Sequence, residues 1–290
     1  MLTNKFKINY SIGSVANGIK TDTFTFFLLF FYSNIIGLKP SLAGLAIFIA
    51  LCVDAITDPL MGTISDRTKS SLGRRHPYML ISFIPMSLGY VFLFAPRQDW
   101  DMSQNDLFVW MTIFTILTRI GMTLFDIPHR AFGGEVTKNY KERTLLMSWR
   151  EMVGWVAGLS NAFLGYGIFF ASTPEYPQGQ LNPDAWFPFA VTGAIFMILS
   201  VLYSSLSTKD EIKSLSKWSG SISLMDILKE LKIAVGNKSF LIFFFGNLFL
   251  SLAWGLANTL TLFVNTYFWE FEATQIKYFL PIYLLATLAA

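Results

Sequence analysis

The chain is poor in charge, in cysteine and in histidine. Only 14% of its 290 residues are charged, against about 25% in a soluble domain, so a soluble protein is excluded. Cys52 is alone and lies within an apolar stretch, which gives no basis for disulfides or a thiolate metal site. The two histidines, His76 and His129, fall at the edges of predicted loops. We therefore predict no structural metal site.

The sequence also lacks the patterns of an enzyme. It has no Ser/His/Asp set, no cluster of metal ligands and no glycine-rich phosphate loop. We therefore predict that it is not an enzyme and needs no cofactor. The net charge of +3 comes from basic residues spread over several loops, which argues against nucleic-acid binding. No pattern indicates an obligate protein partner.

Apolar residues dominate instead. They make up 53% of the chain, and Phe alone occupies 29 positions. Segments long enough to cross a bilayer recur along the whole sequence, separated by short charged stretches. They predict an all-α polytopic membrane protein of about eight spans, at 10–36, 41–64, 78–96, 106–131, 145–171, 187–207, 239–268 and 274–290.

The loops predict the orientation. Lys and Arg gather before the first span and after the second, fourth and sixth, which places the N-terminus in the cytoplasm. The first span is long and lacks a small-residue cleavage site, so it does not resemble a signal peptide. We expect a multi-pass protein of the cytoplasmic (inner) membrane. Because Ala290 stands inside an apolar segment without flanking charge, we also expect a truncated chain.

A long polar segment, 208–238, divides six predicted spans from two. This predicts an N-terminal six-helix bundle at 1–207, a central cytoplasmic loop at 208–238, and an incomplete second bundle at 239–290. Within the loop, Ser223 and Asp226 resemble a capping box that opens an amphipathic helix at the membrane interface. A plain linker between two bundles fits the same segment.

Two carboxylates stand in the middle of the second predicted span. Asp54 and Asp58 are four residues apart, so on a helix they lie one turn apart on the same face. An ionised carboxylate at the bilayer centre costs about 2.5 kcal/mol or more. Two like charges on one face add repulsion. A proton or metal cation held between them would relieve both costs, which predicts an ion-coupled transporter.

Longer motifs surround this pair. Asp54-x-x-x-Asp58-Pro59-x-x-Gly62-x-x-x-Asp66-Arg67, then Gly73-Arg74-Arg75-x-Pro77, resembles the signature of the glycoside–pentoside–hexuronide:cation symporters, the melibiose-permease branch of the major facilitator superfamily. Asp126-Ile127-Pro128, Glu135 to Thr144 and Arg150 agree with it. The resemblance implies two six-helix halves with a small-molecule substrate between them near the midplane. It also implies cation-coupled symport by alternating access.

For the cation site, physics and resemblance point to the same residues. Hard cations prefer oxygen ligands, which Asp54 and Asp58 supply, with Thr57 and Thr123 as neutral candidates. The family commonly carries an amide where Thr57 stands. Sodium and proton coupling therefore both stay open. The alternative is that both aspartates cap or pair within the bundle.

For the substrate, the resemblance implies that Asp126 accepts hydrogen bonds from sugar hydroxyls and that Arg150 donates to them. A structural salt bridge between the two would also explain their burial. Tyr32 and Trp149 are candidates to stack on a sugar ring.

The first span departs from the family pattern. Gly18 replaces a sugar-binding acid, and Asp22, one turn further on the same face, is the substitute that we predict. Lys20 and Arg119 add intramembrane cations. They either neutralise buried aspartates or bind an anionic substrate, such as a uronide, a sulfonated sugar or a lysophospholipid.

A gating role is predicted for residues at the ends of the second and fourth spans. Glycines allow close helix approach, and arginines can bridge to carboxylates such as Glu135. Plain topology-setting charge is the alternative interpretation. The residues are Gly62, Asp66, Arg67, Gly73, Arg74, Arg75, Glu135 and Arg143.

The function predicted from the sequence is therefore cation-coupled symport of a sugar, a glycoside or a related small solute, neutral or anionic. Two alternatives remain: a lipid or lysolipid transporter of the same fold, and an inactive truncated fragment.

Overall fold

The computed structural model describes residues 2–214, 233 and 235–289. These residues form helices and loops without a strand. The predicted amphipathic helix near 223–231 lies outside the described residues. Six helical segments of the described chain are long and apolar enough to cross a membrane: Pro40–Arg67, His76–Leu93, Gln104–Glu135, Tyr140–Phe169, Pro183–Glu211 and Lys238–Phe268.

The first predicted span is helical but irregular. After a short α1 (Asn4–Ser11), it runs through α2 (Ser14–Asp22), a π-helical turn η1 (Thr23–Phe27), α3 (Leu28–Phe30) and a second π-helical stretch η2 (Phe31–Ile36). It ends at Gly37, whose φ of 85° is the left-handed conformation that glycine adopts without a Cβ penalty.

The other helices of the first bundle are more regular. They are α4 (Pro40–Arg67), α5 (His76–Ile81), α6 (Phe83–Leu93), α7 (Gln104–Glu135), α8 (Tyr140–Leu164, continued by η4, Gly165–Phe169) and α9 (Trp186–Ser207). Capping explains two of the starts. The Ser103 hydroxyl and the Asp106 side chain form a capping box at α7, and Asn139 caps α8.

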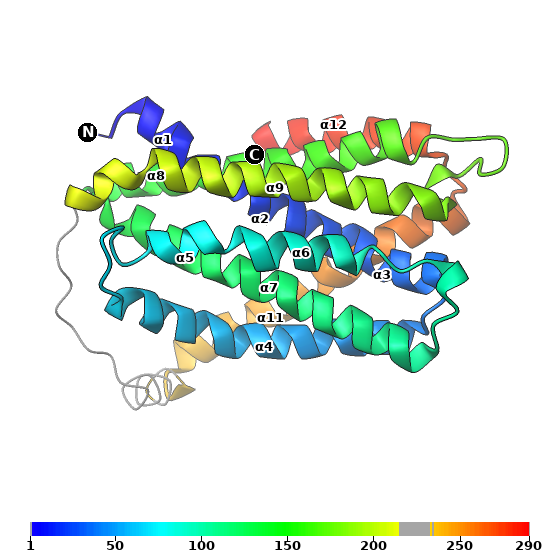
Figure 1. The fold of residues 1–290 in the computed structure, drawn as a ribbon, viewed down its shortest axis with the longest axis horizontal. Helices are drawn as coiled ribbons and strands as arrows, with labels where there is room; N and C mark the ends of the chain where they lie inside the picture. Colours follow the sequence, from blue (N-terminus) through cyan, green and yellow to red (C-terminus); the bar gives the residue numbers. More distant parts are fainter. Residues whose placement is uncertain (1, 215–232, 234, 290) are drawn as a thin grey trace.

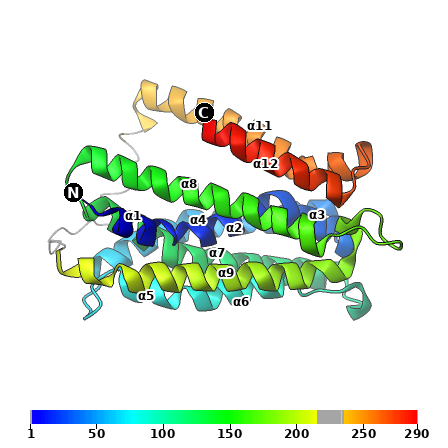
Figure 2. The ribbon, with the colours of Figure 1, turned by 90° about the horizontal axis from the view of Figure 1, so that it is seen from above.

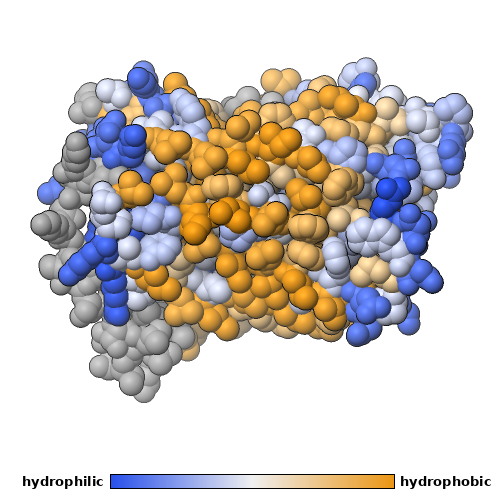
Figure 3. Space-filling model, in the orientation of Figure 1, coloured by the Kyte–Doolittle hydropathy of each residue, from blue (hydrophilic) through white to orange (hydrophobic). Residues whose placement is uncertain are grey.

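The helices run roughly parallel along one long axis (Figure 1). Within the bundle, α7 packs against α4 and α6, while α2 packs against α8 and α9. The segments α11 (Lys238–Phe263), η8 (Val264–Phe268) and α12 (Ala273–Ala289) lie on one flank, next to α8 (Figure 2). The face seen in Figure 3 carries a broad apolar band between two polar ends, as a bilayer-spanning protein requires.

The flank helices contact the bundle where α11 meets η1, where α12 meets α8 and η4, and at one end through what we call the η8 contact. There Gln180 donates to the Thr266 hydroxyl at 3.2 Å and to the carbonyl of Phe271 at 3.2 Å. The Tyr267 hydroxyl donates to Asn34 at 2.8 Å. Along α11, Leu262 is the buried residue. The two parts are thus joined at the end opposite the N-terminus (Figure 1).

Candidate functional site: two charge clusters inside the bundle

The two aspartates of the second span face α7 in the bundle interior. Arg119 forms an ion pair with Asp54, whose side chain is 21% exposed. Thr123, one turn further along α7, donates its hydroxyl to Asp58 at 2.7 Å. We call Asp54, Thr57, Asp58, Arg119 and Thr123 the acid-pair site. The predicted face of α4 is therefore turned inward, where its charges have partners.

Two oxygen atoms of the acid-pair site have no partner. Asp54 Oδ1 and Thr57 Oγ1 are both enclosed and make no hydrogen bond among the described residues. Buried polar atoms rarely lack a hydrogen-bond partner, so these two oxygen atoms require an explanation. Carboxylate and hydroxyl oxygens are the donors that sodium-like cations prefer, and a proton would satisfy the same atoms. The residues present therefore fit a small cation.

A second cluster joins α7 and α8. Arg150 is 1% exposed and forms an ion pair with Asp126, and it donates to Glu151 at 2.5 Å. Arg130 donates to the other oxygen of Asp126 at 2.6 Å. We call Asp126, Arg130, Arg150 and Glu151, with His129, the α7–α8 cluster. The Asp126–Arg150 salt bridge that the sequence allowed is present in this conformation.

His129 does not lie at a loop edge, as the sequence suggested. It lies inside α7, fully buried, and its ring stacks on Tyr10 with centroids 4.1 Å apart. Its Nε2 lies 3.0 Å from the Tyr10 carbonyl, which only accepts, so Nε2 carries the proton. Nδ1 is then free to accept from Arg150 Nε at 3.5 Å. The predicted span ended at 131, whereas α7 continues to Glu135.

The structure separates the remaining candidates. Lys20 makes no ion pair within 4 Å among the described residues. It lies on the α4–α7 side of the bundle, where the charged groups that act on it are Arg119, Asp126, Asp54 and Asp58. Asp22 points toward α8 instead. Trp149 is half-buried beside Arg150. Tyr32 is buried in the core and donates to the Leu93 carbonyl at 2.7 Å, so we leave it out of the proposed site.

Four of the eight predicted gating residues meet at the basic end of the bundle. Arg75 donates to Glu135 at 2.5 Å and lies 2.9 Å from Asp66, while Arg74 lies 2.8 Å from Glu135. We call these four residues the ion-pair network. Gly73 has a φ of 75° and turns the loop before them. All four belong to α4, α7 or the loop between α4 and α5, so the network lies within one bundle. Arg143 is exposed on α8.

These features define a multi-pass membrane transporter of the major facilitator type. The family described as MFS/sugar transport protein matches residues 9–290. The chain belongs to this family and, within it, to the glycoside–pentoside–hexuronide:cation symporters.

The relatives agree with this assignment. An uncharacterized symporter of Synechocystis sp. is 32% identical over 213 residues, which are 71% of this chain and 38% of the relative. A putative glycoside/cation symporter of Escherichia coli is 29% identical over 237 residues, 82% of this chain and 49% of the relative. The chain thus spans about half the length of these relatives or less.

The fold has a solved counterpart. The xylose transporter of Escherichia coli in an inward-open conformation superposes with a TM-score of 0.55 at 15% identity. The match covers 81% of this chain and 56% of that protein.

Proposed function

We propose that this chain is the first part of a cation-coupled symporter that moves a sugar, glycoside or uronide across the cytoplasmic membrane. The coupling ion, sodium or a proton, binds at the acid-pair site, and the solute binds at the α7–α8 cluster. Binding of either would raise the affinity for the other, since linkage makes coupling reciprocal. The basic end of the bundle, with the ion-pair network, faces the cytoplasm.

One observation supports this proposal above the others. Asp54 Oδ1 and Thr57 Oγ1 are enclosed and have no hydrogen-bond partner in the described part of the chain; they lie within about one helical turn of Asp58, the carboxylate to which Thr123 donates. A purely structural pair of aspartates would have its buried oxygens satisfied. Arg119 balances one of the two negative charges, so the site is left with one charge for a monovalent cation to neutralise.

The α7–α8 cluster offers groups for a polar solute. Asp126 already accepts from Arg130 and Arg150, and Glu151 accepts from Arg150. A solute with several hydroxyls, or with a carboxylate, would exchange some of these bonds for its own. This requires the Asp126–Arg150 salt bridge to hold the cluster in shape when solute is absent. Salt bridge and substrate site are then two states of one site.

The experiment measures the uptake of labelled solutes into proteoliposomes. The liposomes contain the protein expressed from its native gene. Methyl galactoside, xylose and glucuronate serve as labelled solutes, under an imposed sodium gradient or an imposed proton gradient. We expect one gradient to drive accumulation of at least one solute. The Asp58→Asn variant should lose gradient-driven accumulation and keep downhill exchange. Accumulation in the variant equal to that of the wild type would refute the proposal.

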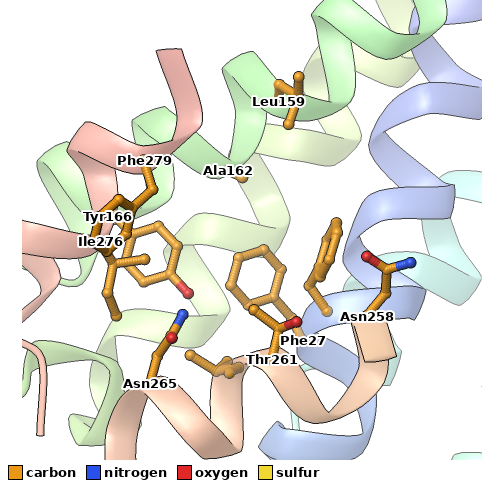
Figure 4. A pocket seen from close by; sticks show the side chains of 11 residues that line it. Phe27, Leu159, Ala162, Tyr166, Asn258, Thr261, Asn265, Ile276 and Phe279 are labelled. Carbon is orange, nitrogen blue, oxygen red and sulfur yellow. The ribbon is translucent and has the colours of Figure 1, made fainter. Parts of the chain in front are cut away.

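A second candidate, a lysolipid transporter, is favoured by a cavity of about 190 Å³ between the bundle and the flank helices. Its wall is mostly apolar, with Phe27, Leu159 and Tyr166 from the bundle and Ile276 and Phe279 from α12 (Figure 4). A labelled lysophosphatidylcholine is therefore the fourth solute in the same assay. Gradient-driven uptake of that lipid alone would favour the second candidate.

A further inference from the structure

A small pocket between α2 and α8 is lined by a carboxyl group, one oxygen of which has no hydrogen-bond partner among the described residues. The pocket has a volume of about 130 Å³, and neither Asp54 nor Asp58 lines it. Its polar wall includes Asn17, Thr21, Asp22, Arg150 and Glu151. The volume is large enough for ordered water, which would give the carboxyl a route for proton exchange.

The carboxyl group in this pocket belongs to Asp22. The residue is 6% exposed, and its Oδ2 is enclosed with no hydrogen-bond partner in the described chain. The carboxyl was expected to replace the sugar-binding acid that Gly18 lacks. In the structure it lies against the backbone of α8, in a pocket that Arg150 and Glu151 also line.

Glycines make room for this carboxyl. A Cβ at Gly158 would lie 2.3 Å from Asp22 Oδ2, and a Cβ at Gly18 would lie 1.9 Å from the Gly154 carbonyl oxygen. The backbones of α2 and α8 therefore touch, and the Asp22 carboxyl fills the space beside Gly158. Such close packing fixes the carboxyl in a place where it meets backbone and no donor.

No described cation compensates the carboxyl. From α8, Arg150 and Glu151 face the pocket, but the three guanidinium nitrogens of Arg150 are engaged by Glu151, Asp126 and His129. On α2 itself, Lys20 lies toward α4 and α7.

The other elements packed on α2 add no counter-charge. The charged residues of α7 near this level, Arg119 and Arg130, are paired with Asp54 and Asp126. In α9, the titratable side chain is Tyr203, bonded to Asn9. The turn η1, Thr23–Phe27, has no titratable residue.

We propose that Asp22 is a proton-binding site, separate from the acid-pair site, that holds its proton in this conformation and exchanges it through the α2–α8 pocket. An ionised carboxylate at this depth without cation or donor would cost several kcal/mol, and protonation removes the charge. The turn η1 directly after Asp22 is a place where α2 can change its twist, because π-helical turns accommodate a displaced backbone. If the proposed function holds, this proton is a second coupled ion.

Infrared difference spectroscopy tests the assignment without any substrate. The protein in lipid nanodiscs is titrated with alkali while the carbonyl stretch of protonated carboxylic acids is followed; ¹³C-labelled aspartate identifies aspartyl bands. We expect the wild type to show an aspartyl band at neutral pH that disappears at alkaline pH. The Asp22→Asn variant should lack this band, and Asp58→Asn, the matched control, should keep it.

Three results would overturn the proposal. They are the absence of an aspartyl band in the wild type at neutral pH, a band that persists in Asp22→Asn, and a band that never titrates while the protein stays monodisperse. The first and third are measured on the wild type, so they stand even when a variant fails to fold. Because uptake that depends on Asp58 is measured separately, failure here and failure of the proposed function are told apart.

Discussion

At the residue scale, the interior charges fall into pairs with different tasks. The Arg119–Asp54 pair is partly exposed, at 13% and 21% of the two side chains, and it leaves Asp54 Oδ1 unused. The Arg150–Asp126 pair is more enclosed and is shared with Arg130 and Glu151. We infer that the first pair sets the charge of the cation site, and that the second holds the solute site in shape.

A substitution at Arg119 tests the role of the Arg119–Asp54 ion pair. Arg119→Gln leaves Asp54 without its counter-charge, and we expect a loss of about 1–3 kcal/mol in the free energy of unfolding. The double variant Asp54→Asn/Arg119→Gln should recover most of that loss, since no charge is then left alone. Thermal unfolding of the purified variants measures both. Equal stability of wild type and Arg119→Gln would show that the ion pair does not matter for folding.

Thr123 tests how Asp58 is held. Thr123→Val keeps the shape and removes the hydroxyl that donates to Asp58 at 2.7 Å. Loss of one hydrogen bond to a charged group, about 1.5 kcal/mol, should weaken cation affinity roughly tenfold. Thr123→Ser keeps the donor and is the matched control. Cation affinities of Val and Ser variants that do not differ would contradict this role for the hydroxyl.

Sequence reasoning reached some of these residues and missed others. The spacing of Asp54 and Asp58, and of Arg119 and Asp126, places each pair on one helix face, and the structure brings those faces together. The burial of His129 was missed because the predicted span ended at 131, which placed this residue at a loop edge, whereas α7 runs to Glu135. That Asp22 contributes to the substrate site stays a prediction: the structure places it in a pocket that Arg150 and Glu151 also line. Helix periodicity gave its face but did not say that α8 covers it.

At the scale of single elements, glycine decides how closely α2 and α8 approach. A Cβ at Gly18 would meet the Gly154 carbonyl oxygen at 1.9 Å, which is backbone and cannot move aside. We expect Gly18→Ala to destabilise the protein by about 1–3 kcal/mol, as overpacking does. Gly44→Ala is the control, because nothing lies within 4 Å of its added Cβ. Thermal unfolding compares the two, and equal effects would contradict the close packing.

The irregular first span could not have been predicted in detail. Its apolar run gave a span at 10–36, whereas the chain turns at Ile12 and Gly13 and then contains two π-helical stretches before Gly37. Such turns depend on tertiary packing, here on α8, α9 and α11. The regular spans were easier, because length and apolar content alone predict a helix across a bilayer. Their ends moved by several residues, as with 106–131 against Gln104–Glu135.

At the scale of the whole molecule, the flank helices contact the bundle where α11 meets η1, where α12 meets α8 and η4, and at the η8 contact. They diverge from the bundle toward the basic end (Figure 2). We propose that the end opposite the N-terminus is closed, because Gln180 contacts Thr266 and Phe271 there.

Cross-linking tests that closure. Gln180→Cys and Thr266→Cys, in a Cys52→Ser background, place thiols where two side chains now lie 3.2 Å apart. We expect a short bifunctional thiol reagent to join them in membranes without substrate, and the joined protein should lose transport. Ser70→Cys with Asn247→Cys is the control pair, from the α4–α5 loop and from α11. Cross-linking of both pairs at the same rate would contradict closure at one end.

The central claim is that the acid pair holds the coupling cation, and equilibrium cation binding tests it most directly. Radioactive sodium is titrated onto purified wild type, Asp58→Asn and Asp58→Glu at several pH values. For wild type, we predict either saturable sodium binding or, for a proton-coupled protein, proton uptake that accompanies solute binding. Both should be lost in Asp58→Asn and partly kept in Asp58→Glu. Sodium and proton binding in Asp58→Asn equal to wild type would contradict the claim.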